Sequence, residues 1–231
     1  TGIANRWFNR DGTCFTKSEG AFNNPESPER GLSFFGADNS YKAWFDVPTL
    51  PTLNYTSQKL RDVIYKNPDS LVKKWLKAPY CTDGWRFDVA DTMARNNEIQ
   101  LHHEIWPEIR KSIKEEKSDA FILAEDWSDC TEFLNGDEWD SQMNYYASSR
   151  AIREFYGQHD IFVSREKLLQ GVNYKSTAKD LSKRISLFYA RLPFVMTQIQ
   201  FNLLDSHDVP RFHNDNKISK DAENKIVFIT Y

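Results

Sequence analysis

Cysteine is scarce in this 231-residue chain, which has only Cys14, Cys81 and Cys130. An odd number at wide spacing argues against a disulfide framework and against a zinc site, and favours a reducing compartment. Long apolar runs are also missing. No stretch approaches the roughly 20 residues that cross a bilayer, and residues 1–9 lack the charged start and apolar run of a signal peptide. We therefore expect no membrane span.

Neither sign of charge is in excess, since 33 acidic residues face 30 basic ones and the formal net charge is -3. Such a chain has no global attraction to nucleic-acid phosphates or to anionic lipids. Phosphate-binding glycine motifs are missing too, because no Gly-x-Gly-x-x-Gly follows a predicted strand and no Walker-type glycine–lysine spacing occurs. We expect no nucleic acid, membrane or nucleotide among the partners.

Aromatic residues are plentiful, at 14% of the chain, with seven tryptophans and ten tyrosines. Most of these rings are expected in the core, but sugar-binding clefts are also rich in aromatic rings, on which the apolar faces of sugars stack. Composition alone leaves both readings open.

The chain changes character after its first quarter. Residues 1–56 are interrupted by Gly, Asn, Pro and Ser, as in residues 23–28, and predict a long irregular loop region of the kind that is usually functional. Residues 57–231 alternate predicted helices with short apolar strands. The strands are expected at residues 84–90, 120–124, 139–144 and 201–204, and the helices at 57–66, from 68, at 107–117 with Pro107 in the first turn, over most of 147–196, and from 217.

Strands that alternate with helices favour a parallel sheet wrapped in helices, either doubly wound or a barrel. The missing phosphate motifs favour the barrel. Three acids stand at the carboxyl ends of predicted strands, where barrel enzymes carry their chemistry: Asp88, Glu125 and Asp208. Asp88 and Glu125 are one strand–helix repeat apart, so we expect them on neighbouring strands, with Asp208 across the barrel mouth.

Two neighbouring carboxyl groups can act as a general acid and an ionised nucleophile, which is the chemistry of retaining glycosidases. The same acids could instead cap helices or pair with arginines. Arg86 lies two residues before Asp88 on the same strand face and is expected to hold it ionised, or to form a structural ion pair. His207 is expected to hydrogen-bond sugar hydroxyls, or to be an ordinary polar residue. Three aromatic residues are candidates to shape the cleft, and equally to be core: Trp85, Trp127 and Tyr145.

Four ordered segments resemble signatures of the α-amylase family, glycoside hydrolase family 13: residues 50–54, 84–90, 124–127 and 204–208. The resemblance implies a (β/α)8 barrel, with residues 1–56 as the loop domain after the third strand. It also implies that Asp88 is the nucleophile, Glu125 the general acid/base and Asp208 the stabiliser of the transition state, while His207 binds substrate.

Within the family, residues 23–28, 94–97 and 205–208 are most similar to maltodextrin glucosidases and to the neopullulanase and cyclomaltodextrinase group. This implies retaining hydrolysis of α-1,4-glucosidic bonds in short maltodextrins, or of related α-glucans, in the cytoplasm. Two alternatives stay open. One is a transglycosylase that passes the same intermediate to a sugar, and the other is a non-catalytic amylase-like scaffold, although such scaffolds usually lose one of the three acids.

Several departures from the family pattern matter. The first signature and the segment of the eighth strand are absent, so we expect a piece that holds roughly strands four to seven and is inactive alone unless it dimerises or recruits missing segments. Asp91 and Thr92 stand where typical α-amylases carry Lys-His, which argues against endo-cleavage of long starch. Asp126 replaces an apolar residue, and nothing in the sequence explains it. Ser206 replaces the commoner Asn.

No cofactor is expected to be required. Many relatives bind calcium, so calcium stays an alternative, although no Asp/Asn-rich loop with calcium-ligand spacing appears. A homodimer also stays an alternative.

Overall fold

The structure is a computed structural model that describes residues 26, 30–34, 41–44, 47, 50–157 and 176–212. The chain divides into two compact units. Unit 1 consists of residues Thr1–Tyr80 and Met93–Glu116, and unit 2 of Cys81–Thr92 and Lys117–Tyr231. Most of the loop region predicted over residues 1–56, and the helix predicted from residue 217, lie outside the described residues, so both stay predictions.

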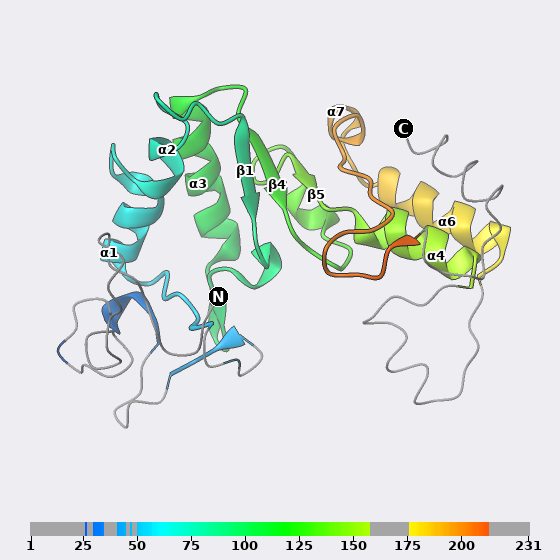
Figure 1. Ribbon diagram of the computed structural model, residues 1–231, viewed down its shortest axis with the longest axis horizontal. Helices are drawn as coiled ribbons and strands as arrows, with labels where there is room; N and C mark the ends of the chain where they lie inside the picture. The colour runs from blue at the N-terminus through cyan, green and yellow to red at the C-terminus, as the bar shows by residue number, and fades with distance from the viewer. Residues whose placement is uncertain are drawn as a thin grey trace. The chain divides into compact units, whose positions relative to one another are not determined.

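Helices dominate the described part of unit 1. The first, α1 (Gln58–Arg61), is capped by Ser57, whose hydroxyl accepts the Leu60 N–H at 3.4 Å. The chain continues through a π-helical turn, η4 (Asp62–Lys66), to α2 (Leu71–Lys74). Figure 1 shows α1 and α2 beside α3 (His102–Glu116). The remaining elements are η2 (Arg30–Leu32) and the short antiparallel pair β2 (Arg95–Asn96) and β3 (Ile99–Gln100).

The start of α3 differs from the prediction. The helix begins at His102, so Pro107 lies in its second turn and not in its first. A proline there lacks the N–H that would bond the carbonyl group four residues earlier, which weakens the helix locally. The apolar face compensates, because four of its side chains are fully buried: Ile105, Trp106, Ile109 and Ile113.

Unit 2 contains a parallel sheet of three strands in the order β1 (Gly84–Phe87), β4 (Phe121–Ala124) and β5 (Ser141–Gln142). These strands confirm the first three sequence predictions, each being shorter than expected. Gly84 lies opposite Phe121, and a Cβ atom at Gly84 would come within 2.1 Å of the Phe121 carbonyl oxygen. Glycine at this position is therefore what lets β1 approach β4 so closely.

The strand predicted at residues 201–204 is reduced to a single parallel bridge between Phe201 and Met143. The Phe201 N–H donates to the Ser141 hydroxyl at 2.7 Å, so a side chain takes the place of a regular backbone ladder. The predicted helical stretch is confirmed in its described parts by α4 (Arg150–Phe155), α6 (Ala178–Tyr189) and α7 (Phe194–Thr197).

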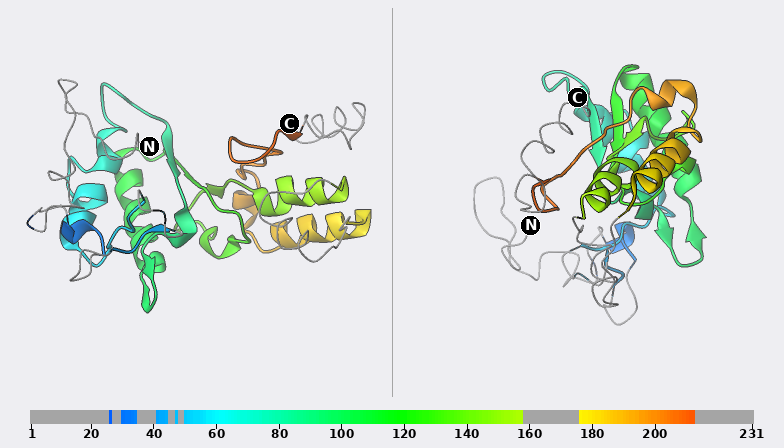
Figure 2. Two further views of the ribbon diagram at one scale, coloured as in Figure 1. Left: turned by 60° about the horizontal axis from the view of Figure 1, so that its bottom comes forward. Right: turned by 90° about the vertical axis from the view of Figure 1, so that its right-hand side faces the viewer.

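Helices α4 and α6 lie side by side (Figure 2), and Arg184 of α6 pairs with Glu154 of α4 at 2.8 Å. A complete capping box between Thr177 and Asp180 starts α6. The described residues of unit 2 also contain three short helical turns: η5 (Ala90–Thr92), η6 (Thr131–Phe133) and the π-helical η7 (Tyr145–Ser149). Among the described helices of the chain, none has both the length and the apolar character of a membrane span.

Candidate active site

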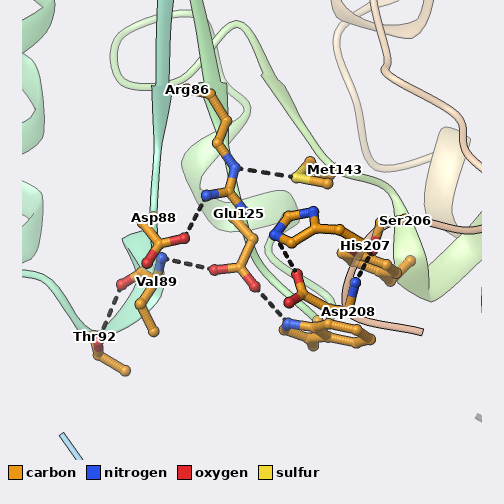
Figure 3. Close-up of polar contacts among 11 residues, drawn as sticks. Arg86, Asp88, Val89, Thr92, Glu125, Met143, Ser206, His207 and Asp208 are labelled. Atoms are coloured by element: carbon orange, nitrogen blue, oxygen red, sulfur yellow. Dashed lines mark hydrogen bonds and ion pairs between the residues drawn. The ribbon is translucent and has the colours of Figure 1, made fainter. Parts of the chain in front are cut away.

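The carboxyl ends of β1 and β4 place two acids at one rim of the sheet. Phe87 lies opposite Ala124 in the parallel register, and the next residues of the two strands are Asp88 and Glu125. Figure 3 shows both carboxylates at this rim, together with Asp208. The prediction that Asp88 and Glu125 follow neighbouring strands is confirmed.

Asp88 is exposed, with 72% of its side chain accessible to solvent. Its carboxylate forms an ion pair with the guanidinium group of Arg86, as the alternation along the strand predicts. The Nε of Arg86 contacts the sulfur of Met143 on the neighbouring chain segment at 3.5 Å. The sulfur contact and the ion pair together hold the Arg86 side chain beside the Asp88 carboxylate.

Glu125 lies in a different environment, because only 7% of this residue is exposed. Its Oε2 accepts the Val89 N–H at 2.7 Å and its Oε1 accepts the Trp127 indole N–H at 2.5 Å (Figure 3). The backbone of Glu125 is also bound on both sides, to Phe87 O at 2.8 Å and Ala90 N at 3.1 Å. The rim therefore holds one exposed and one buried carboxyl group. Such different environments allow one acid to act as a proton donor and the other as a nucleophile.

Val89 contributes to this site through its backbone. Its φ angle is 48°, in the left-handed region, where a β-branched residue is a genuine outlier. The amide N–H thereby donates to Glu125, while the carbonyl oxygen accepts the Thr92 hydroxyl at 3.0 Å. Strained backbone of this kind clusters at functional sites. Nothing in the sequence signalled a role for Val89, since the side chain takes no part.

Asp208 and His207 lie next to each other at the rim, with His207 Nε2 3.2 Å from Asp208 Oδ2. The backbone N–H of Asp208 donates to the Ser206 hydroxyl at 3.1 Å, and the same hydroxyl accepts the Tyr145 O–H at 2.7 Å. Ser206 thus connects the loop that carries Asp208 to a buried ring. The sequence had marked Ser206 only as a departure from the family pattern.

Two of the predicted aromatic residues belong to this cluster. The ring of Trp127 stacks on that of Tyr145, with centroids 3.8 Å apart and planes within 8°. Burial raises the pKa of the Tyr145 hydroxyl group; the hydrogen bond to Ser206 opposes this, and the charges of Asp208 and Glu125 add to it. The partly buried Trp127 ring therefore lies beside the acids and is packed against the fully buried Tyr145 ring.

Trp85 is not brought into this cluster. Along β1 its side chain lies on the face opposite that of Arg86, and its ring centroid is 6.2 Å from that of Phe87. The structure thus separates Trp85 from the six other residues proposed from the sequence, which it gathers at the rim: Arg86, Asp88, Glu125, Trp127, His207 and Asp208.

Within the described ranges, no three His, Cys, Asp or Glu side chains converge as ligands for a metal ion. Two further acids lie near this rim: Asp91 in η5, on which the charge of Glu125 acts, and Asp126, which directly follows Glu125. The need for a calcium ion or another cofactor stays a matter of prediction.

Parallel strands that end in contrasting carboxyl groups at one rim define the class of barrel-type glycosidases. The pattern of one such family, described as alpha amylase, catalytic domain, matches residues 7–230. The chain belongs to this family, glycoside hydrolase family 13, and its described strands and helices are part of a (β/α)8 barrel.

Individual relatives agree with this assignment. The chain is 29% identical over 195 residues to a cyclomaltodextrinase of Geobacillus thermopakistaniensis, covering 76% of this chain and 28% of the relative. Among solved structures, the type III pullulan hydrolase from Thermococcus kodakarensis matches with a TM-score of 0.58 and 27% identity, over 81% of this chain and 29% of that one. A debranching enzyme from Nostoc punctiforme shares the fold, with a TM-score of 0.66 at 23% identity over 93% of this chain and 44% of that one. The chain therefore spans less than a third of the length of the first two proteins.

Proposed function

We propose that the whole protein is a retaining glycoside hydrolase that cleaves α-1,4-glucosidic bonds in short maltodextrins or related α-glucans. The observation that carries the proposal is the pair of acids at one rim of the parallel sheet, with Asp88 exposed beside Arg86 and Glu125 buried among hydrogen-bond donors. The names of the similar cyclomaltodextrinase and pullulan hydrolase agree with an α-glucan substrate.

In the proposed reaction the Asp88 carboxylate attacks the anomeric carbon while the glycosidic bond to the leaving oxygen breaks. Glu125 gives its proton to that oxygen, and then, as a carboxylate, takes a proton from the water that hydrolyses the ester between Asp88 and the sugar. Arg86 supports the first role because its guanidinium group forms an ion pair with the Asp88 carboxylate and orients it. The Val89 amide and the Trp127 indole hold the Glu125 carboxyl group in one orientation.

His207 and Asp208 are proposed to bind ring hydroxyl groups more tightly as the sugar flattens toward an oxocarbenium ion. Both side chains are accessible, at 71% and 39% of their surface, so they can reach a saccharide. The partly buried Trp127 ring, which stacks on the fully buried Tyr145 ring, would form the apolar wall of the same cleft. A cytoplasmic location, independence of a cofactor and homodimer formation remain predictions.

The test uses the whole protein with maltotriose as substrate. We expect Asp88→Asn to lower kcat by at least about 1,000-fold, because the nucleophile is lost. Asp137→Asn, at an exposed position of unit 2, serves as the control and should retain the activity of the unaltered protein.

Proton NMR of the products at early times decides the stereochemistry, and release of the α-anomer is expected. An Asp88→Asn variant with near-full activity, or release of the β-anomer, would contradict the proposal. Oligosaccharides longer than maltotriose among the products would identify the transglycosylase alternative, since they form when a sugar intercepts the intermediate.

A further inference from the structure

Asp91 and Asp126 are two acids that the proposed reaction does not use. Asp126 directly follows Glu125 and is only 1% exposed. Its Oδ1 accepts two hydrogen bonds from Ser128, from the backbone N–H at 2.6 Å and from the hydroxyl at 2.8 Å. Its Oδ2 is buried and receives no hydrogen bond from the part of the chain that the structure describes. A buried carboxylate oxygen in this state is costly unless a proton donor reaches it.

Two neighbours, the Cys130 thiol and Asp91, lie within hydrogen-bonding reach of Asp126. A thiol is a weak donor, so Asp91 is the neighbour that can supply a strong one. It lies in η5, the turn that follows β1, and its pKa is raised to about 6 by burial first, then by the charge of Asp126 and by a hydrogen bond to Asp126. The charge of Glu125 adds to the shift, and a backbone hydrogen bond from Thr92 opposes it. A protonated Asp91 can donate to the Asp126 carboxylate, whereas two ionised groups would only repel each other.

The pair connects the same two segments that hold Glu125. The turn after β1 already binds Glu125 twice, through the Val89 N–H to its side chain at 2.7 Å and the Ala90 N–H to its carbonyl oxygen at 3.1 Å. A hydrogen bond between Asp91 and Asp126 adds a third connection, one residue further along each segment. Val89 is held in a strained backbone conformation. The direction of its N–H group toward Glu125 therefore depends on the contacts that hold the turn in place.

We propose that Asp91 and Asp126 form a carboxyl pair that shares one proton, joins the segments after β1 and β4, and so positions Glu125 for the reaction. Both are positioning residues. Loss of the shared proton leaves two adjacent anions, which push the η5 turn away from β4 and loosen the Val89 hydrogen bond to Glu125. The inference rests on the proposed function for its catalytic consequence, but the pair itself is a property of the fold.

The groups that act most strongly on Asp91 are Asp126, the backbone of Thr92 and Glu125. Besides Glu125 at the end of β4, the Cys130 thiol lies near Asp126, and its pKa is raised by burial and then by the charge of Asp126. Ser128 donates to Asp126, and its hydroxyl is 3.9 Å from the Cys130 sulfur. The thiol therefore keeps its proton and adds no charge that would compete for the shared one.

The experiment compares Asp91→Asn and Asp91→Ala in the whole protein, with Asp137→Asn as the control for removing an acid elsewhere. The asparagine NH2 group can donate to the Asp126 carboxylate and does not lose its proton in this pH range. Asp91→Asn therefore imitates the protonated pair at every pH tested. We expect kcat of Asp91→Ala on maltotriose to fall about tenfold at pH 5.5 with little change in KM, because a small displacement of a catalytic group is costly.

Asp91→Asn should restore kcat at pH 5.5 to within about twofold of the unaltered protein, and should exceed that protein progressively between pH 6 and 8. An Asp91→Asn variant that behaves like Asp91→Ala would overturn the proposal. The proposal would also be overturned if the activity of Asp91→Asn, divided by that of the unaltered protein, fell as pH rises. Such a fall would mean that the charge of Asp91 assists the reaction. Calcium-dependent stabilisation that Asp91→Asn abolishes would also overturn the proposal, in favour of a shared cation.

A second readout separates this proposal from the proposed function. Thermal unfolding of the unaltered protein and of Asp91→Asn, followed from pH 4 to pH 7.5, should give midpoints that diverge with rising pH, reaching about 2–4 °C in favour of Asp91→Asn. Equal divergence for Asp137→Asn, or none for Asp91→Asn, would contradict the shared proton whether or not the protein hydrolyses maltotriose. If the midpoints diverge but no hydrolysis is found, the pair stands and the proposed function fails.

Discussion

Each unit of the chain holds a cluster of carboxyl groups, and the cluster of unit 1 is compensated by cations whereas that of unit 2 is crowded with like charges. In unit 1, Glu104 and Glu108 face Arg61, at 2.7 and 3.9 Å, and Glu108 also faces Lys66 at 3.4 Å. In unit 2, the acids Asp91, Asp126 and Glu125 lie close enough for their charges to act on one another. The first arrangement is typical of a structural ion network, and the second of a functional site.

The pKa values show the consequence for stability. For Glu108, burial acts to raise the pKa, but the Tyr65 hydroxyl and the charges of Lys66 and Arg61 lower it below its model-compound value of 4.5. Its contribution to stability is therefore present above pH 4.5 and is lost as pH falls. Asp91 has the opposite sign: its contribution is present below 3.8 and is lost as pH rises through about 6. Asp91 thus costs stability at neutral pH, which natural proteins tolerate chiefly at functional sites.

The largest effect that tests this contrast is expected at Glu125. Glu125→Gln removes the acid but keeps a side chain that can occupy the same place, so kcat on maltotriose should fall by at least about 1,000-fold. Activity on a 4-nitrophenyl glucoside, whose leaving group needs little protonation, should fall much less. Steady-state kinetics on both substrates gives the two ratios, and an equal loss on both would show that Glu125 does not act as the acid.

A smaller effect is expected at Asp208. Asp208→Asn keeps the backbone N–H that binds Ser206, but it removes the charge that is proposed to bind ring hydroxyl groups in the transition state. We expect kcat to fall about 100-fold with a modest change in KM, since the interaction strengthens in the transition state. A variant that raises only KM would place Asp208 in ground-state binding. Circular dichroism of the variant checks that the fold is retained.

The smallest effect is expected in unit 1, and on stability alone. Glu108→Gln should lower the free energy of unfolding at pH 7 by about 0.5–1 kcal/mol, because the partners are partly exposed and screened. The difference from the unaltered protein should vanish below about pH 4. Urea unfolding at several pH values measures it. If Glu108→Gln lost activity at pH 7 without losing stability, the cluster of unit 1 would not be purely structural, and the contrast with the cluster of unit 2 would fail.

Much of the framework was predictable from short patterns in the sequence. The spacing of 37 residues between Asp88 and Glu125 predicted neighbouring parallel strands, because one strand–helix repeat has about that length. Alternation along β1 predicted the contact between Arg86 and Asp88, and the same alternation places Trp85 on the other face. The start of α3 was missed because a buried apolar face outweighs a proline in the second turn.

Other parts of the site depend on geometry that no local pattern encodes. The Val89 amide reaches Glu125 only because the backbone adopts a left-handed angle, which the side chain of valine does not favour. The effect of Asp126 on Asp91 joins residues 35 positions apart through the parallel register of β1 and β4. Asp91 and Asp126 were each visible as departures from the family pattern, but the influence of one on the other became apparent only in three dimensions.

A residue that works through its main chain has an unusual mutational profile. Position 89 supplies an N–H group and a turn, so amino acids of very different size are expected to be interchangeable there. Glycine would also remove the strain of the left-handed backbone conformation. Proline alone lacks the hydrogen that the neighbouring acid requires. Sequence variation at such a position therefore gives no measure of its importance, since what natural selection preserves there is a shape and not a side chain.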